Sequence, residues 1–316
     1  MAELNESIRR NDFMRVKSDQ KKSQRRAFAR IGLNDEAMQV IERAARLGAR
    51  QVMAISKTPG KFKARLKPDQ TPVTIADISS QKVIMRVLGT LFSKDKICAE
   101  ESEDIGKQDK EAAGVMLYVD PLDGTASFIR GQDVATVGIC MYENSVPQRA
   151  AICRPFQKQL IVAQKGKGAF LFLLNERLDI IGRPEKLQIL ERKDLSGGML
   201  YWDSPLTARS TPPFQDFVSK IMRSVPKLGV RSIGSNIANQ AAVALGQGDV
   251  GLTLAVGGFY DIAVGGFVIE EAGGIMVGTD GKPVTPKTKA ALYGNKDAVG
   301  QLLPLFKKSF KDYKGF

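Results

Sequence analysis

The sequence predicts an α+β protein with an N-terminal α+β half and a C-terminal α/β half, and two patterns lead to this prediction. Between Ala135 and Gln164, short segments of alternating polarity are separated by turns, which is typical of an antiparallel meander. After about Asp194, strand-like and helix-like segments alternate, which indicates an α/β unit. We therefore divide the 316 residues into a basic arm at 1–33, an α+β half at 34–195 and an α/β half at 196–316.

In the N-terminal half, apolar residues recur at helical spacing over Asp35–Ile55, with Asn34 as the expected cap. The extended segment Thr71–Asp77 leads to a second helix over Ile78–Leu91, which Asp77 is expected to open. Short apolar segments then predict strands at Ile97–Ala99, Val115–Val119, Ala135–Tyr142, Arg149–Arg154 and Leu160–Gln164.

In the C-terminal half, we expect helices over Gln215–Ser224 and Asn236–Leu245, with a strand at Val230–Ile233 between them. The stretch Val250–Ile269 is almost entirely apolar or Gly and approaches the length of a membrane span. Asp261 would then lie mid-bilayer at a cost of about 3 kcal/mol, and several Gly residues interrupt the helical pattern. We therefore interpret the stretch as a buried strand, a tight loop and a packed helix, with no membrane partner.

The formal net charge of +13 fits an anionic substrate, an acidic partner, or both. Much of this charge lies in the first thirty residues and in the last ten, as in solvated arms. The sequence contains no RNA-recognition pattern, so nucleic acid is not expected as a partner.

The chain has no histidine, which excludes Ser-His-Asp and Cys-His nucleophile systems and zinc sites with His ligands. Any general base must therefore be a carboxylate, a lysine or a metal-bound water. Cys98, Cys140 and Cys153 show no metal-binding or redox spacing, so we expect buried, inert thiols and a cytoplasmic location.

The hexapeptide Asp120–Thr125 carries the strongest chemical signal, because it follows the apolar run Val115–Val119 directly. Two carboxylates and a carbonyl at the end of a buried strand are suited to a hard cation. The N–H groups of Gly124 and Thr125, at the start of a helix, would form an anion site beside it. Taken alone, the same residues also fit an Asp-Gly turn.

Further acidic and polar residues accompany the hexapeptide in a fixed order: Asp77, Glu100-Glu101, Ser235-Asn236 and Asp261. This ordered set, from about Asn34 to Asn295, resembles the inositol monophosphatase-like family of lithium-sensitive, Mg²⁺-dependent phosphatases. Bisphosphate nucleotidases and fructose bisphosphatases are among its members. The resemblance implies a layered α/β/α/β sandwich, a homodimer, and two or three Mg²⁺ ions (or Mn²⁺) in the cleft between the halves.

The resemblance also implies roles for individual residues. Glu100, Asp120 and the Leu122 carbonyl are expected to bind the first metal. The second would be bound by Asp120, Asp123 and Asp261.

The phosphate of the substrate is expected to lie against the backbone N–H groups of Gly124 and Thr125. The Thr125 hydroxyl and Glu100 would orient the attacking water, with Asp77 behind Thr125. Ser235 and Asn236, with Asp123, would face the substrate and its leaving group.

Each of these residues also has an alternative interpretation. Asp77 alone fits a helix cap, and Glu100-Glu101 fits solvated charge after an edge strand. Two positions depart from the family pattern: Tyr260 replaces a Trp, and Leu254 replaces a Glu that contacts ring hydroxyls in inositol-specific members.

The substrate is expected to be a small phosphorylated metabolite, such as an inositol monophosphate or a similar polyol or sugar phosphate. A 3′(2′),5′-bisphosphate nucleotidase or a fructose-1,6-bisphosphatase is an alternative, in which Arg130 or Arg231 would contact a second phosphate. A catalytically silent relative that binds nucleic acid or a partner through its basic arms is the alternative from another class.

Overall fold

The structure is a computed structural model that describes residues 27–57, 64–67, 71–102, 114–203 and 211–314. Most of the expected basic arm at 1–33 lies outside these residues. Within them the chain forms two large β-sheets and a two-stranded ribbon of β1 (Arg65–Leu66) and β2 (Pro72–Val73).

The larger sheet has seven strands in the order β3-β4-β5-β6-β7-β8-β9. Only β3 and β4 run parallel, and the neighbours from β4 onward pair antiparallel, which confirms the predicted meander. The strands are β3 (Ile97–Ala99), β4 (Val115–Asp123), β5 (Thr136–Glu143), β6 (Val146–Arg154), β7 (Gln159–Gln164), β8 (Gly168–Leu174) and β9 (Ile180–Lys186).

The smaller sheet has the order β11-β10-β12-β14-β13, with β10 parallel to both β11 and β12. The carboxyl ends of these three strands therefore meet at one edge, which is where α/β sheets bind ligands. The strands are β10 (Met199–Trp202), β11 (Gly229–Arg231), β12 (Val250–Leu254), β13 (Ile275–Gly278) and β14 (Ala290–Gly294).

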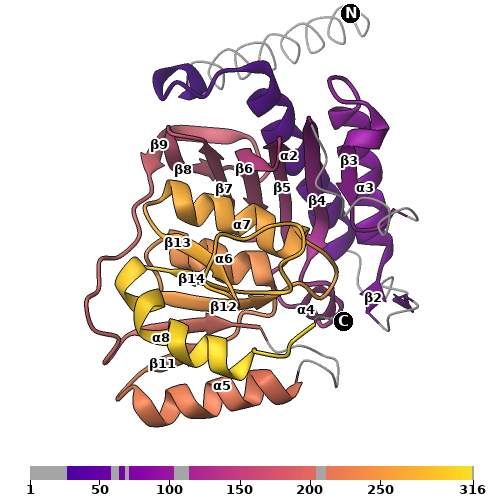
Figure 1. Cartoon of the computed structure of the whole chain (residues 1–316). Helices are drawn as coiled ribbons and strands as arrows, with labels where there is room; N and C mark the ends of the chain where they lie inside the picture. The colour runs from indigo at the N-terminus through magenta and orange to yellow at the C-terminus, as the bar shows by residue number, and fades with distance from the viewer. Residues whose placement is uncertain (1–26, 58–63, 68–70, 103–113, 204–210, 315–316) are drawn as a thin grey trace, which may run out of the picture.

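Helices cover both sheets and separate them (Figure 1). The pair α2 (Glu36–Ser56) and α3 (Ile75–Leu88) covers one face of the larger sheet. The pair α6 (Asn236–Ala244) and α7 (Tyr260–Glu271) packs between the two sheets. The outer pair α5 (Thr211–Ser224) and α8 (Lys296–Ser309) covers the smaller sheet and adds a fifth layer to the four that were predicted.

Three apolar clusters fill the spaces between these layers. One lies between α2, α3 and the larger sheet and includes Ile41 and Leu117. The second surrounds α6 and α7 and includes Ile237 and Val264. The third lies under α5 and α8.

Because α7 is buried along nearly its whole length, it is apolar on all sides, which explains the membrane-like composition of Val250–Ile269. No helix in the described part of the chain is both long and apolar enough to cross a membrane.

Two helix starts differ from the predictions. Asp35, not Asn34, caps α2, because its Oδ1 accepts the Met38 N–H at 3.0 Å. Thr74 caps α3, so this helix begins at Ile75 and not at Ile78. Asp77 is the reciprocal partner of Thr74 in a capping box, an arrangement that satisfies two unpaired N–H groups.

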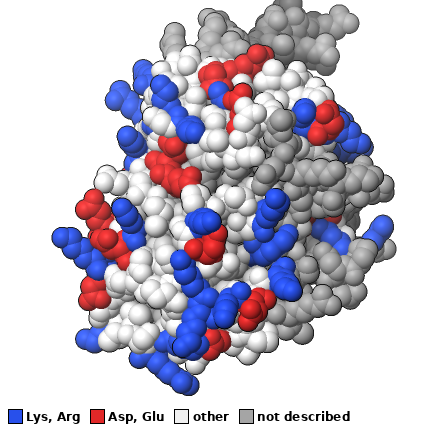
Figure 2. Space-filling model, in the orientation of Figure 1, with Lys and Arg blue, Asp and Glu red and all other residues white. Residues whose placement is uncertain are grey.

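None of the three cysteines forms a disulfide, and all three are buried, as expected. Charged side chains of both signs are spread over the face seen in Figure 2, and basic ones gather in its lower half, where α5 and α8 lie. Arg223 lies in the last turn of α5, and Lys307 and Lys308 lie in the last turn of α8, where their charges complement the negative ends of the two helix dipoles.

Candidate active site

The site begins where β4 ends. Asp120 and Asp123 both lie in β4, opposite Gly138 and Thr136, and the register shifts between them. This bulge turns both carboxylates toward one side, since strict alternation would send residues three apart to opposite faces. Gly124 then takes a left-handed conformation (φ 92°) and caps the five-residue helix α4 (Thr125–Ile129).

Asp261 joins these two carboxylates from the first turn of α7. Its Oδ2 accepts the Gly257 N–H at 2.9 Å, and its backbone oxygen accepts Gln240 Nε2 at 2.7 Å. Asp120, Asp123 and Asp261 each place one carboxylate oxygen within 4.8 Å of the others, and all three are buried. The apolar stretch that contains Asp261 thus places the Asp261 carboxylate beside the end of β4.

Three buried carboxylates repel one another unless a cation compensates their charge. Burial, followed by the neighbouring carboxylates, raises the pKa of Asp120 and of Asp261 well above the ordinary range. Burial also raises the pKa of Asp123 to about 6. No Lys or Arg among the described residues forms an ion pair with any of the three. Since hard divalent cations prefer clustered carboxylate oxygens, the donor set fits Mg²⁺ or Mn²⁺.

Glu100 borders this cluster from the end of β3. Its charge is, after burial, the largest contribution to the raised pKa of Asp120. Lys67 Nζ lies 2.8 Å from Glu100 Oε1 and 2.6 Å from Glu101 Oε1. Although burial would lower it, the pKa of Lys67 is raised, because the two carboxylates stabilise its charge. Glu100 and Glu101 are therefore not merely solvated charge.

Asp77 and Thr125 are linked directly. Thr125 Oγ1 lies 2.9 Å from Asp77 Oδ1 and 3.1 Å from the Leu122 carbonyl oxygen. Asp77 Oδ2 accepts the Thr74 N–H and hydroxyl at 2.8 and 2.5 Å. Burial raises the pKa of Asp77 to about 6, against the hydrogen bonds from Thr74. Asp77 is therefore both a helix-capping residue and the partner of Thr125.

Asp123 is bound to the start of α6. Its Oδ2 accepts the Ser235 hydroxyl at 2.5 Å and the Ile237 N–H at 2.6 Å. Ser235 in turn accepts the Ala238 N–H at 3.0 Å as the cap of α6. The Ser235 hydroxyl is buried in these contacts, so it positions Asp123 instead of lying open to a leaving group.

Residues 22–311 match the model of the inositol monophosphatase family. The chain belongs to this family. The "Nus factor SuhB" of Xylella fastidiosa is 31% identical over 201 residues, which are 63% of this chain and 66% of that protein. Inositol monophosphatase 1 of Mus musculus is 23% identical over 225 residues, which are 71% and 76% of the two chains.

A solved structure also shares the fold. The extragenic suppressor protein suhB of Bartonella henselae superposes with a TM-score of 0.73 at 24% identity. The match covers 87% of this chain and 99% of that one. The layered α+β fold expected from the resemblance is thereby confirmed.

The structure shows where the two residues that depart from the family pattern lie. Tyr260 is buried against the Gly257-Gly258 turn, where a Cβ on Gly257 would lie 2.4 Å from the tyrosine hydroxyl. The Tyr side chain thus packs against the turn whose N–H groups bind Asp261. Leu254 ends β12 and lies in the apolar cluster under α5 and α8, so this position offers nothing to a substrate.

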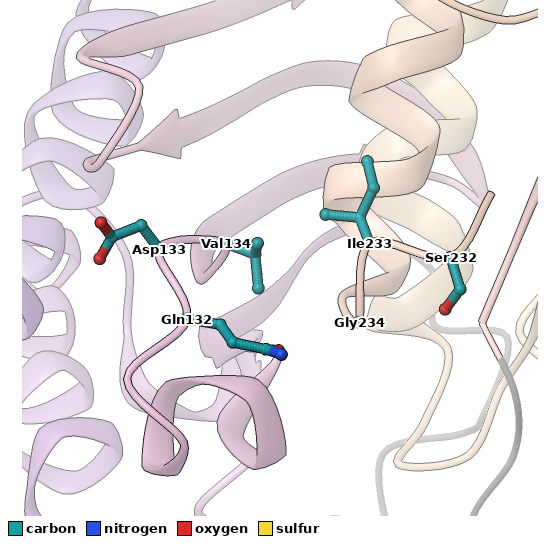
Figure 3. Close-up of a pocket in the computed structure, with 6 residues that line it drawn as sticks. All are labelled: Gln132, Asp133, Val134, Ser232, Ile233 and Gly234. Atoms are coloured by element: carbon teal, nitrogen blue, oxygen red, sulfur yellow. The ribbon is translucent and has the colours of Figure 1, made fainter.

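A groove of about 620 Å³ adjoins the start of α6. It is lined by Gln132, Asp133 and Val134 on one side and by Ser232, Ile233 and Gly234 on the other. Figure 3 shows the Gln132 side chain extending toward Gly234, whereas the Asp133 carboxylate turns away from that segment. The Ser127 hydroxyl donates to the Gly234 carbonyl at 3.1 Å and ties the two walls together.

Several residues of the site were not predicted. The family pattern gave no reason to single out Lys67, Gly257 or Asp203. Asp203 follows β10, which runs parallel to β11 and β12, and it accepts the hydroxyl of Ser232, which lines the groove. A carboxylate at the carboxyl end of a parallel strand is a signal that pattern reading can use. Lys67 lies in a polar loop, and only the folded chain brings it to Glu100.

Proposed function

We propose that this protein is a metal-dependent phosphatase that hydrolyses a small phosphate monoester by direct attack of water. The observation that supports this most strongly is the buried cluster of Asp120, Asp123 and Asp261, for which no described Lys or Arg provides a counter-ion. Bound Mg²⁺ would lower the pKa of water and neutralise phosphate charge, which supplies a nucleophile without histidine.

The residues of the chain would position the metal and the attacking water. Asp120, Asp123 and Asp261 would hold the metal, with Glu100 and the Leu122 carbonyl completing the ligands. Asp77 accepts the Thr125 hydrogen bond, which would leave the oxygen lone pairs of Thr125 to accept a hydrogen bond from the attacking water. Glu100 would share the orienting of this water.

The phosphate would lie against the N–H groups of Gly124 and Thr125. Because α4 has only five residues, these two N–H groups and the metal bind the phosphate, and a helix dipole adds little. Asn236, the first residue of α6, would face the leaving group. Lithium sensitivity, a homodimer and a cytoplasmic location, which the resemblance implies, stay predictions.

A second function, binding to a partner without catalysis, is supported by one observation. The relative from Xylella fastidiosa carries the name of a Nus factor, which is not the name of an enzyme. The complete set of metal carboxylates favours catalysis, because a binding protein has no need for three uncompensated buried carboxylates.

The test is phosphate release with and without Mg²⁺ from inositol 1-phosphate, fructose 1,6-bisphosphate, adenosine 3′,5′-bisphosphate and glycerol 2-phosphate. We expect Mg²⁺-dependent turnover that Asp123→Asn abolishes, and the rank order of the esters identifies the substrate class. A folded, Mg²⁺-binding protein that releases phosphate from none of them supports the partner-binding alternative.

A further inference from the structure

A buried arginine without an acidic partner among the described residues lies at the same edge of the larger sheet as the carboxylate cluster. Arg154 is the last residue of β6 and is 7% exposed. In the described part of the chain its guanidinium forms one hydrogen bond, from Nη1 to Gln159 Oε1 at 2.7 Å, and the buried Nε has no partner. By contrast, Arg46, which is buried to a similar extent, pairs with Glu42 at 2.7 Å. Burial without a carboxylate is costly for a guanidinium and lowers the pKa of Arg154, so an anion brought by a ligand would remove this cost.

The strand register places Arg154 two strands away from the carboxylate cluster. Asp123, the last residue of β4, pairs with Thr136 of β5. One position further along β5, Val137 pairs with Cys153 of β6. Arg154 therefore lies beside Thr136, and two strand spacings, roughly 10 Å, separate the backbones of Asp123 and Arg154.

The Arg154 side chain lies on the face of the larger sheet that α6 covers. Side chains alternate between the faces along a strand, and Cys153 belongs to the apolar cluster under α2 and α3 on the opposite face. Ile152, two residues before Arg154, belongs to the cluster around α6 and α7. Thr136 is on this face as well, because its Oγ1 lies 3.5 Å from Oγ of Ser235, the N-cap of α6. The guanidinium and the Asp123 carboxylate thus share the face that meets the start of α6.

The turn that follows Arg154 contacts a wall of the groove at the start of α6. Gln157 Nε2 donates to the Asp133 carbonyl at 2.6 Å, and Asp133 lines the groove. None of the six lining residues is Lys or Arg, so they offer no positive charge to an anion. The exposed Arg130 and Arg231 each donate to a nearby backbone carbonyl. Arg154, on the strand that leads into this turn, is placed to supply the missing charge.

We propose that Arg154 binds a second oxyanion, a phosphate or a carboxylate, on the leaving group of the substrate. This inference rests on the proposed phosphatase function. The phosphate to be released would lie at Gly124 and Thr125, and a leaving group of the size of a sugar is long enough to reach Arg154 from there. The Nε–Nη2 edge of a guanidinium matches two oxygens of a phosphate or a carboxylate, and such charge-assisted pairs are the strong ones. The hydrogen bond from Nη1 to Gln159 fixes the orientation of this edge.

The test compares Arg154→Met with the unchanged protein on two matched pairs of esters. Fructose 1,6-bisphosphate and fructose 1-phosphate differ by a second phosphate, and 6-phosphogluconate and sorbitol 6-phosphate differ by a carboxylate. For the doubly anionic member of one pair we expect kcat/KM to fall at least about thirtyfold, mainly through KM, and for its partner no more than about threefold. The pair that shows this difference identifies the anion. Arg223→Met, at an exposed arginine of α5, is the matched control and should affect both members of a pair equally.

Stability separates a ligand-binding arginine from one that serves the fold. Because Arg154→Met replaces an unpaired buried charge by an apolar side chain of similar length, Tm without ligand should stay the same or rise. A Tm that falls by many degrees would overturn the inference, since Arg154 would then hold β6 to β7 through Gln159. Arg154→Lys keeps the charge but loses the bidentate edge, so it should restore only part of the activity lost on the doubly anionic ester.

Equal losses within both pairs would also overturn the inference, because Arg154 would then act on the site as a whole and not on a second anion. If the unchanged protein hydrolyses no ester, the proposed function fails separately. The inference is then decided by calorimetric binding of the same two pairs. It requires that the unchanged protein bind the doubly anionic member of one pair more tightly and that Arg154→Met remove this preference, and equal affinities within both pairs reject it.

Discussion

Ser235 donates a hydrogen bond of 2.5 Å to Asp123 and so joins the N-cap of α6 to the last residue of β4. The two residues are 112 positions apart in the chain. The same hydroxyl accepts the Ala238 N–H and caps α6. One side chain thus caps a helix and fixes the direction of a carboxylate of the cluster, which links α6 to β4 at the site.

Replacing Ser235 by Ala should destabilise the protein. The change removes a helix cap and leaves the buried Asp123 carboxylate with one fewer donor, which together should cost about 2 kcal/mol in the free energy of unfolding. Urea denaturation measures this loss. Ser235→Thr keeps the hydroxyl and should cost much less, and equal costs for the two variants would show that the hydrogen bonds contribute little.

Gly124 should tolerate no side chain. Its φ is 92°, and a Cβ would lie 2.9 Å from the Gly234 carbonyl oxygen and 3.0 Å from Ser235 Cβ. Gly124→Ala should therefore cost more than the roughly 1 kcal/mol of the left-handed conformation, because β4 and α6 must also separate. Gly131→Ala is the matched control, since Gly131 has a φ of 73° and open space around its Cβ position. Equal unfolding free energies for the two variants would contradict the close approach.

Stabilisation by Mg²⁺ should increase with pH. Burial raises the pKa of Asp123 to about 6 in the folded protein, and it raises the pKa values of Asp120 and Asp261 well above the ordinary range. A raised pKa gives stability that is present below the unfolded pKa of about 4 and is lost as the pH rises through the folded value. Without Mg²⁺, these carboxylates therefore destabilise the folded state at neutral pH.

The measurement is the difference in Tm with and without Mg²⁺ at about pH 5 and at about pH 7.5, which cancels the contributions of groups away from the site. We expect a small difference at the lower pH and one of several degrees at the higher. A difference that is independent of pH would mean that Mg²⁺ binds elsewhere.

Lys67 should compete with a metal ion for Glu100. Its Nζ contacts both Glu100 and Glu101, and burial with the charge of Glu100 raises the pKa of Glu101 to about 7 despite this lysine. Lys67→Met should lower stability at neutral pH without metal, and it should tighten Mg²⁺ binding by up to about tenfold. Calorimetric titration tests this, with Lys96→Met at an exposed ion pair as the control. Unchanged or weaker Mg²⁺ binding in Lys67→Met would contradict the competition.

The strands and helices with strong periodicity were predictable. The long helix α2, the meander and the strand-loop-helix at Val250–Ile269 follow from local patterns of apolar residues. The edge strand β9 was missed, because it is half-exposed and rich in charged residues, so it shows no clear alternation. The predicted start of α3 was wrong because Asp is a residue type that is common at the N-cap, so Asp77 was taken as the cap. In the structure Thr74 is the N-cap, and the capping box places Asp77 at the third helical position.

The carboxylates that form the cluster were predictable, but the residues that contact them were not. Asp120 and Asp123 stand together in the sequence after an apolar run, and Asp261 stands alone in an apolar stretch that makes a buried carboxylate costly. By contrast, Lys67 and Asp203 act through contacts made across the chain, at loops without regular spacing. Such contacts depend on the packing of layers, which no local pattern encodes.

The account depends on the cluster of Asp120, Asp123 and Asp261 being a metal site. Calorimetric titration of the unchanged protein with Mg²⁺ tests this most directly, beside Asp261→Asn and the exposed control Glu176→Gln. The account predicts saturable binding that weakens at least about tenfold in Asp261→Asn and is unchanged in the control. No binding to the unchanged protein, or the same affinity in Asp261→Asn, would contradict it.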